Sequence, residues 1–224
     1  MQKKEHIKIF LGVMVMGSIW GMLEASLGSV LHIIHFPYKG EVMANIGFFL
    51  MGWALVRYKK IWIPAGMALI AASFKILNVA IVGVPLTNRM IVNPAMAIIL
   101  EGLILVGVVG IAHKVYEKNI LYRSAAGFAG MFLSYLTFSF VFFYVFRQGP
   151  MEIVSMGELA FFTLRNGGLA SMLALFSFPS GMWAGRMSTF ECSSAKNEQK
   201  LYYTTSLLVI SCCWLISAVF IVLV

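Results

Sequence analysis

The chain has 224 residues, of which 60% are hydrophobic and only 12% are charged, and its mean hydropathy is +0.88. Soluble globular domains contain about 45–50% apolar and about 25% charged residues, so this composition excludes an ordinary soluble domain and indicates an integral membrane protein. The net charge of +8 therefore belongs to the loops of a membrane protein, and we expect the lipid bilayer, and no nucleic acid, as its partner.

Seven stretches of the chain are apolar enough to form membrane-spanning helices, which need about 20 predominantly apolar residues. We predict an all-α fold, a polytopic transmembrane helical bundle of about six core spans plus a C-terminal seventh. Residues 1–187 would form the core, residues 188–200 a cytoplasmic polar linker, and residues 201–224 the last helix. The predicted spans are residues 10–33, 42–56, 61–83, 94–115, 125–146, 167–185 and 201–224.

The basic residues between these spans fall alternately on two sides. Twelve Lys and Arg residues precede the first span or follow the second, fourth and sixth, whereas the opposite side holds Lys39, Arg89, Arg147 and Arg165. Cytoplasmic loops carry the excess of basic residues. The pattern predicts a multi-pass protein of the cell membrane with a cytoplasmic N-terminus and an extracytoplasmic C-terminus.

One face of the first predicted helix combines small and ionisable residues. Successive residues of an α-helix are turned by about 100°, so positions three and four apart share a face. The Gly17-x-x-x-Gly21 spacing permits close approach of another helix, whereas a charge inside the membrane costs about 2.5–3.5 kcal/mol and marks a partner or a function. The residues of this face are Gly17, Gly21, Glu24, Gly28, His32 and His35.

Two later spans place further polar residues at a depth similar to that of Glu24. The third carries Lys75 and Asn78 one turn apart, and the fourth carries Glu101, with Asn93 about two turns earlier. At about 1.5 Å per residue, the three charges lie near the same level, a little outside the bilayer midplane. One lysine facing two glutamates forms either a structural ion pair between helices or part of a binding site.

Polar residues also gather at the predicted outer ends of the spans. Asn166-Gly167-Gly168 follows a possible short interfacial helix at residues 158–164 and predicts a break or a restart of the helix. A polar column that opens outward is typical of a pocket for a small solute, including an anionic one. The candidate substrate-binding residues are Glu24, His32, His35, Lys75, Asn78, Asn93, Glu101, Arg165 and Asn166.

Metal binding and catalysis are alternatives for the same residues. Glu24, His32, His35 and Glu101 supply nitrogen and oxygen ligands that transition metals accept. The chain has no aspartate, no recognisable nucleophile with a histidine and an acidic partner, and no nucleotide-binding motif. We therefore predict no cofactor and favour a role other than catalysis, with energy supplied by a partner or an ion gradient.

Over roughly residues 8–187, the chain resembles the substrate-capture (S) components of energy-coupling factor transporters. The likeness consists of a compact set of about six apolar helices, a cytoplasmic N-terminus, polar outer loops and the small residues Gly17, Gly21 and Ala25 on the first helix. The resemblance implies that these three residues contact a transmembrane coupling subunit. It also implies that a solute is captured from outside and that an ATPase energises its transport.

Two further functions compete with solute binding. In a membrane enzyme or metal-handling protein, Glu24 and Glu101 would act as acid/base groups or as ligands together with His32 and His35. In a structural subunit of a larger complex, the charged residues would only hold helices together.

Overall fold

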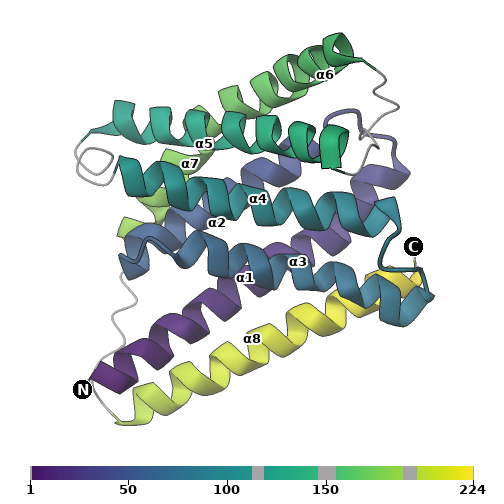
Figure 1. The fold of residues 1–224 in the computed structure, drawn as a ribbon. Coiled ribbons are helices and arrows are strands. Elements are labelled where there is room, and N and C mark those ends of the chain that lie inside the picture. The colour runs from purple at the N-terminus through teal and green to yellow at the C-terminus, as the bar shows by residue number, and fades with distance from the viewer. Residues whose placement is uncertain (1, 113–118, 146–154, 189–195, 224) are drawn as a thin grey trace.

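The fold is a bundle of helices, seen in a computed structural model that describes residues 2–112, 119–145, 155–188 and 196–223 (Figure 1). The secondary structure of these residues is entirely helical, which confirms the predicted fold class. The α-helices are α1 (Gln2–Ile33), α2 (Lys39–Tyr58), α3 (Ile63–Val82), α4 (Arg89–Ile111), α5 (Ile120–Phe140), α6 (Met156–Phe162), α7 (Gly168–Met187) and α8 (Lys196–Leu223). Two π-helical segments, η1 (Val141–Val145) and η2 (Thr163–Gly167), extend α5 and join α6 to α7.

Six helical segments in the described residues are long and apolar enough to cross a membrane: α1, α3, α4, α5 with η1, the continuous run from α6 to α7, and α8. The protein is therefore a multi-pass integral membrane protein. The second predicted span, residues 42–56, corresponds to α2, whose composition does not meet the same criterion of length and apolarity. The buried side chains of α2 include Glu41 and Asn45, and the helix packs mainly against α7 and α1. A helix surrounded by protein needs no continuous apolar surface, which explains its polarity.

The helix continues from α6 to α7 through residues 166–168, where the sequence predicted a break or a restart. Residues Thr163–Gly167 form the π-helical segment η2, and α7 begins at Gly168 without an intervening loop. The prediction from Asn166-Gly167-Gly168 was wrong because a widened helical turn accommodates the two glycines. The predicted linker, residues 188–200, lies largely outside the described residues, as do the last positions of the predicted spans 94–115, 125–146 and 201–224.

Helices α2 and α7 cross with their backbones in close contact. A Cβ atom added to Gly181 would lie 2.0 Å from the carbonyl oxygen of Phe49, and one added to Gly185 would lie 2.5 Å from that of Trp53. Glycines four residues apart allow helices in membranes to approach this closely. The Gly181-x-x-x-Gly185 pair thereby fixes α7 against α2.

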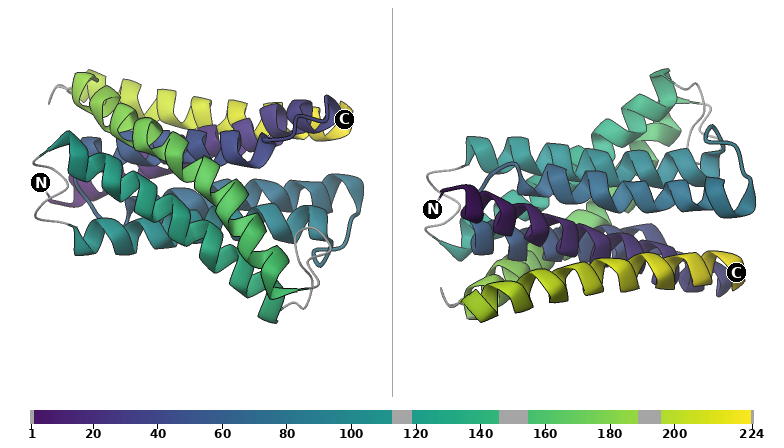
Figure 2. Two further views of the ribbon diagram at one scale, coloured as in Figure 1. Left: turned by 90° about the horizontal axis from the view of Figure 1, so that it is seen from above. Right: turned by 90° about the horizontal axis from the view of Figure 1, so that it is seen from below.

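The last helix, α8, lies alongside α1 and starts at the same end of the bundle, so α8 ends at the opposite end from the start of α1 (Figures 1 and 2). It also contacts α3, where the rings of Phe74 and Trp214 have centroids 4.3 Å apart. At its start, the Tyr202 hydroxyl donates to the carbonyl oxygen of Lys8. Contacts in the first third and in the second half of α8 therefore attach it to the core.

Candidate functional site

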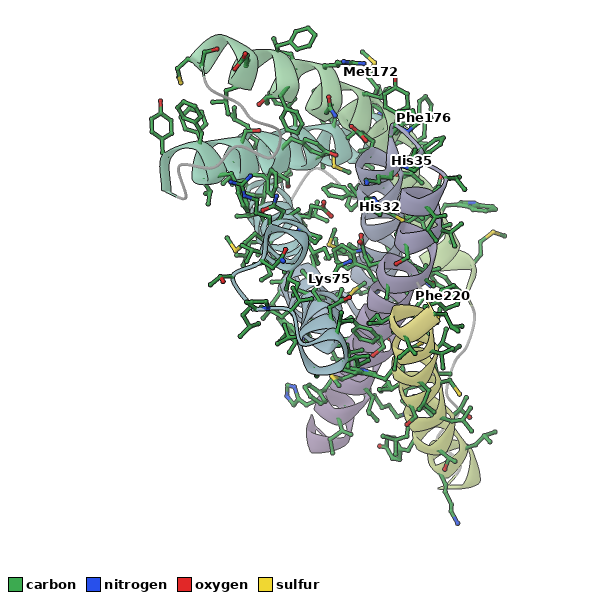
Figure 3. The ribbon with its side chains drawn as sticks, turned by 90° about the vertical axis from the view of Figure 1, so that its right-hand side faces the viewer. His32, His35, Lys75, Met172, Phe176 and Phe220 are labelled. Carbon is green, nitrogen blue, oxygen red and sulfur yellow. The ribbon has the colours of Figure 1, made fainter. Side chains whose placement is uncertain are left out.

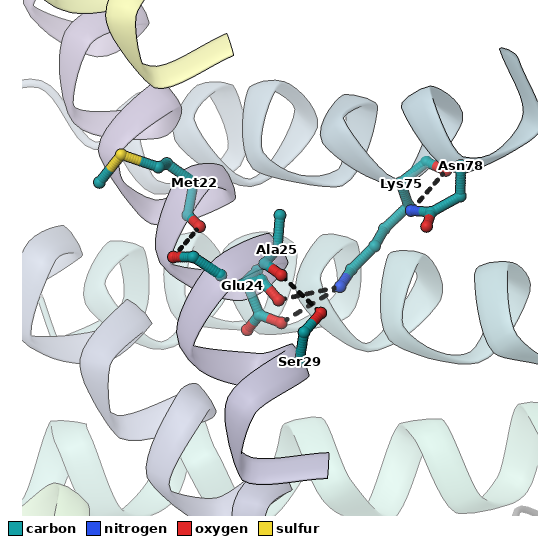
Figure 4. A network of polar contacts seen from close by, with 7 residues as sticks. Met22, Glu24, Ala25, Ser29, Lys75 and Asn78 are labelled. Atoms are coloured by element: carbon teal, nitrogen blue, oxygen red, sulfur yellow. Dashed lines mark hydrogen bonds and ion pairs between the residues drawn. The ribbon is translucent and has the colours of Figure 1, made fainter. Parts of the chain in front are cut away.

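An ion pair between α1 and α3 forms the first part of the site. The Nζ atom of Lys75 lies 3.6 Å from Oε2 of Glu24 and 3.4 Å from the carbonyl oxygen of the same residue (Figure 4). The two side chains keep only 13% and 11% of their surface accessible, respectively. The Asn78 amide donates to the carbonyl oxygen of Lys75, one turn earlier on α3. The pair that the sequence predicted from depth is therefore formed.

The small residues of α1 bring these two charges together. A Cβ atom on Gly17 would lie 2.8 Å from Cβ of Ile70, and one on Gly21 would lie 2.4 Å from the ring of Phe74. Ala25, one turn farther along, is buried as well. This face of α1 therefore packs within the chain, and its close contact with α3 sets Glu24 opposite Lys75.

Glu101 on α4 is a buried acidic side chain near this pair. Only 6% of the residue is accessible, and its carboxyl group lies within electrostatic range of Glu24. Its Oε2 atom is buried and has no hydrogen-bond partner among the described residues. An unsatisfied buried polar group costs about 1–3 kcal/mol, and more when charged, so such an atom in a folded protein requires an explanation.

A third carboxyl group, Glu41, forms the second part of the site. It is buried near the start of α2, accepts a hydrogen bond from the side chain of Asn166, and lies within electrostatic range of Arg165. Both of these partners belong to η2. One turn after Glu41, the Asn45 amide donates to the carbonyl oxygen of Ala170 at 3.0 Å and accepts from the Ser177 hydroxyl at 2.7 Å. The π-helical segment therefore presents Asn166 to α2, and π-helical turns are frequent at functional sites.

Tyr135 on α5 connects the two parts. Its phenol lies within electrostatic range of Glu41, Glu101 and Glu24. A Cβ atom on Gly40 would lie 3.8 Å from the Tyr135 hydroxyl, which places the hydroxyl beside the start of α2. We call the combined group the carboxyl cluster. It consists of Glu24, Glu41, Glu101, Lys75, Arg165, Asn166 and Tyr135.

Sequence reasoning missed two members of this cluster. Glu41 precedes the predicted span 42–56 by one residue, and Tyr135 lies within the predicted span 125–146. Neither residue was among the predicted site residues. The signal available for Glu41 was its place in the helical pattern of α2, four residues before the buried Asn45.

The two histidines lie at the surface, at the end of the bundle where α1 finishes (Figure 3). His32 is in the last turn of α1, and its Nδ1 atom contacts Nζ of Lys39. His35 follows the helix with a positive φ of 52°. Asn93 is half-buried on α4, two turns before Glu101. In the described part of the chain, no three His, Cys, Asp or Glu residues are grouped so as to hold a metal ion.

The carboxyl cluster offers hydrogen-bond donors and acceptors from α1 to α5 and from η2, inside a membrane-embedded bundle. No protein-family model, curated protein or solved structure matches the chain. The functional argument therefore depends on the cluster itself, and the resemblance to transporter S components stays a prediction.

Proposed function

We propose that this membrane protein binds a small solute at the carboxyl cluster from the extracytoplasmic side, as the substrate-binding subunit of a transporter that a partner energises. The observation that carries the proposal is the buried Oε2 atom of Glu101, which lacks a hydrogen-bond partner among the described residues. A cluster that served packing alone would gain stability by satisfying this atom or by replacing it with an apolar group. A bound solute would supply the hydrogen-bond donor that this atom lacks.

The position of the cluster also supports solute binding. Its residues come from helices that are far apart in the sequence, so a solute would contact several of them at once. A ligand shifts a conformational equilibrium when it contacts the alternative states differently, and contacts with many helices favour such a difference. Polar groups inside membrane segments commonly mark the path or site of a transported solute.

The transport role follows from the resemblance to S components, in which a coupling subunit and an ATPase would complete the transporter. The solute-binding role is independent of that resemblance and can be tested on the purified chain. The structural subunit and the metal-handling protein are the alternatives that the same experiment separates.

Native mass spectrometry of the gently extracted protein tests the proposal. We expect a retained small molecule in the wild type and in Lys60→Ala, an exposed lysine that serves as the matched control. Lys75→Ala should change the affinity at least tenfold, because it removes the one basic group paired with Glu24 at the proposed site, and interactions of charged groups contribute about 1.5–3 kcal/mol. The monodispersity of the variant in size-exclusion chromatography shows whether it has folded.

Two results would contradict the proposal. A folded protein that retains no molecule, or the same affinity in Lys75→Ala and wild type, would assign the Lys75–Glu24 pair to helix packing. Elemental analysis of the same preparation addresses the metal alternative. A stoichiometric metal that is lost on His35→Ala would assign the protein to metal handling instead.

A further inference from the structure

The charges of the carboxyl cluster do not balance. Glu24 is paired with Lys75 at 3.6 Å, and Glu41 accepts from Asn166 and lies within electrostatic range of the exposed Arg165. Glu101 is left over, and the charged group identified beside it is Glu24, a second carboxylate. The cluster as described thus contains three carboxyl groups and two basic groups.

A carboxyl group buried beside another carboxylate is stabilised either by a proton or by a cation. A protonated carboxyl group has a hydroxyl that must donate to an acceptor. The buried Oε2 atom of Glu101 has neither a donor nor an acceptor within hydrogen-bond distance among the described residues. A proton on Oε1 would remove the charge but would leave Oε2 without a hydrogen bond, whereas a cation with N–H donors accounts for both the charge and the missing hydrogen bond.

We infer that the solute carries an ammonium-type group of a small organic amine and that Glu101 is its anchor. This inference rests on the proposed solute-binding function and adds the sign of the charge. An ammonium group has three N–H donors. The carboxylate of Glu101 accepts one of these N–H groups. Glu24 and the Tyr135 hydroxyl, which both lie within electrostatic range of Glu101, are the acceptors for the other two.

The same arrangement disfavours the anionic solute that the sequence had left open. An anion beside Glu101 would add a third negative charge next to Glu24, and like charges in a low-dielectric site repel strongly. Of the two basic groups of the cluster, Lys75 is paired with Glu24 at 3.6 Å, and the exposed Arg165 lies within electrostatic range of Glu41. A cation at Glu101 leaves the Lys75–Glu24 pair in place.

Three probes of similar size and different charge test the inference: propylammonium, propionamide and propionate. The protein, reconstituted in lipid nanodiscs, is heated with each probe at the same pH and ionic strength, and the dissociation constant is derived from the shift of the unfolding midpoint. We expect propylammonium alone to stabilise the wild type. Glu101→Gln should raise its dissociation constant at least tenfold. The control Glu158→Gln, an exposed residue whose role in a helix-capping box glutamine also fills, should leave it unchanged.

A second variant tests the unbalanced charge without any ligand. Glu101→Met replaces the unsatisfied carboxyl group by an apolar side chain of similar length, so the ligand-free variant should unfold at a higher temperature than the wild type. A lower unfolding temperature, in a variant that still folds, would mean that Glu101 already has a partner and would overturn the inference.

The outcomes separate this inference from the proposed function. Stabilisation by propionamide or propionate, but not by propylammonium, overturns the cationic solute while solute binding stands. If no probe acts, the molecule retained in native mass spectrometry decides: an amine supports the inference, and a neutral or anionic molecule overturns it. A protein that neither responds to a probe nor retains a molecule removes both proposals.

Discussion

Replacing Lys75 by methionine isolates the energetic role of the one ion pair that joins α1 to α3. The variant keeps the length of the side chain and removes its charge. Glu24 then lies next to Glu101 with no cation beside it. We expect the free energy of unfolding to fall by about 3 kcal/mol, the lower end of the range for breaking a buried pair.

The magnitude follows from the geometry of the pair. At 3.6 Å and an effective dielectric constant of about 20, the Coulomb attraction is about 4–5 kcal/mol. The desolvation of both groups offsets part of this attraction. The residual accessible surface of 13% and 11% places the pair below a fully buried one, which is why we choose the lower end of the range.

Equilibrium unfolding by SDS titration in mixed micelles measures this change. The double variant Glu24→Gln/Lys75→Met removes both charges, and we expect it to unfold within about 1 kcal/mol of the wild type, because replacing a whole buried pair is often nearly neutral. The exposed Lys60→Met is the control, with an expected change within about 0.5 kcal/mol. Equal losses in the single and double variants would refute the coupling between Lys75 and Glu24.

Two further predictions concern helix packing and use the same unfolding assay. Gly181→Ala should lower the free energy of unfolding by about 1–3 kcal/mol, because the new methyl group would lie 2.0 Å from a carbonyl oxygen of α2. The control Gly107→Ala adds a methyl group with nothing within 4 Å and should be neutral or stabilising by up to about 1 kcal/mol; matching losses at the two glycines would contradict the packing. Trp214→Ala should cost about 2 kcal/mol, roughly half the loss for a fully buried tryptophan, since the residue is half-buried against α3. The exposed Leu215→Ala on the same helix should cost little, and an equal loss there would argue against a specific contact between α8 and the core.

The length and composition of the apolar stretches predicted the bundle well, because a lipid environment imposes a simple rule on composition. A helix that faces lipid must be apolar over about 20 residues, and most of the predicted spans satisfy this rule in the structure. Helix α2 is less apolar than this rule requires, because it packs mainly against other helices. Counting residues from the helix ends also placed Glu24 and Lys75 at the same depth, because both lie on regular helices with a rise of about 1.5 Å per residue.

The remaining site could not be derived in this way because two local departures from α-helical geometry change the phase of the chain. The π-helical segment η2, which contains Asn166, turns by less than 100° per residue, so a count of 100° per residue does not give the position at which Asn166 meets Glu41. At the other departure, α1 ends at Ile33 and His35 has a positive φ. The helical face predicted from Gly17 to His35 therefore ends before His35.

The two charge variants should change stability in opposite directions, and this contrast connects the fold to the proposed function. Lys75 is paired with Glu24 at 3.6 Å, so removing Lys75 leaves Glu24 unpaired and should lower the stability. The buried Oε2 atom of Glu101 has no partner among the described residues, so replacing Glu101 by methionine should raise the stability. Residues that a fold tolerates at a loss of stability are commonly those that function requires. A carboxyl group whose removal stabilises the protein and abolishes amine binding would show that the cost is retained for the ligand and not for the helices.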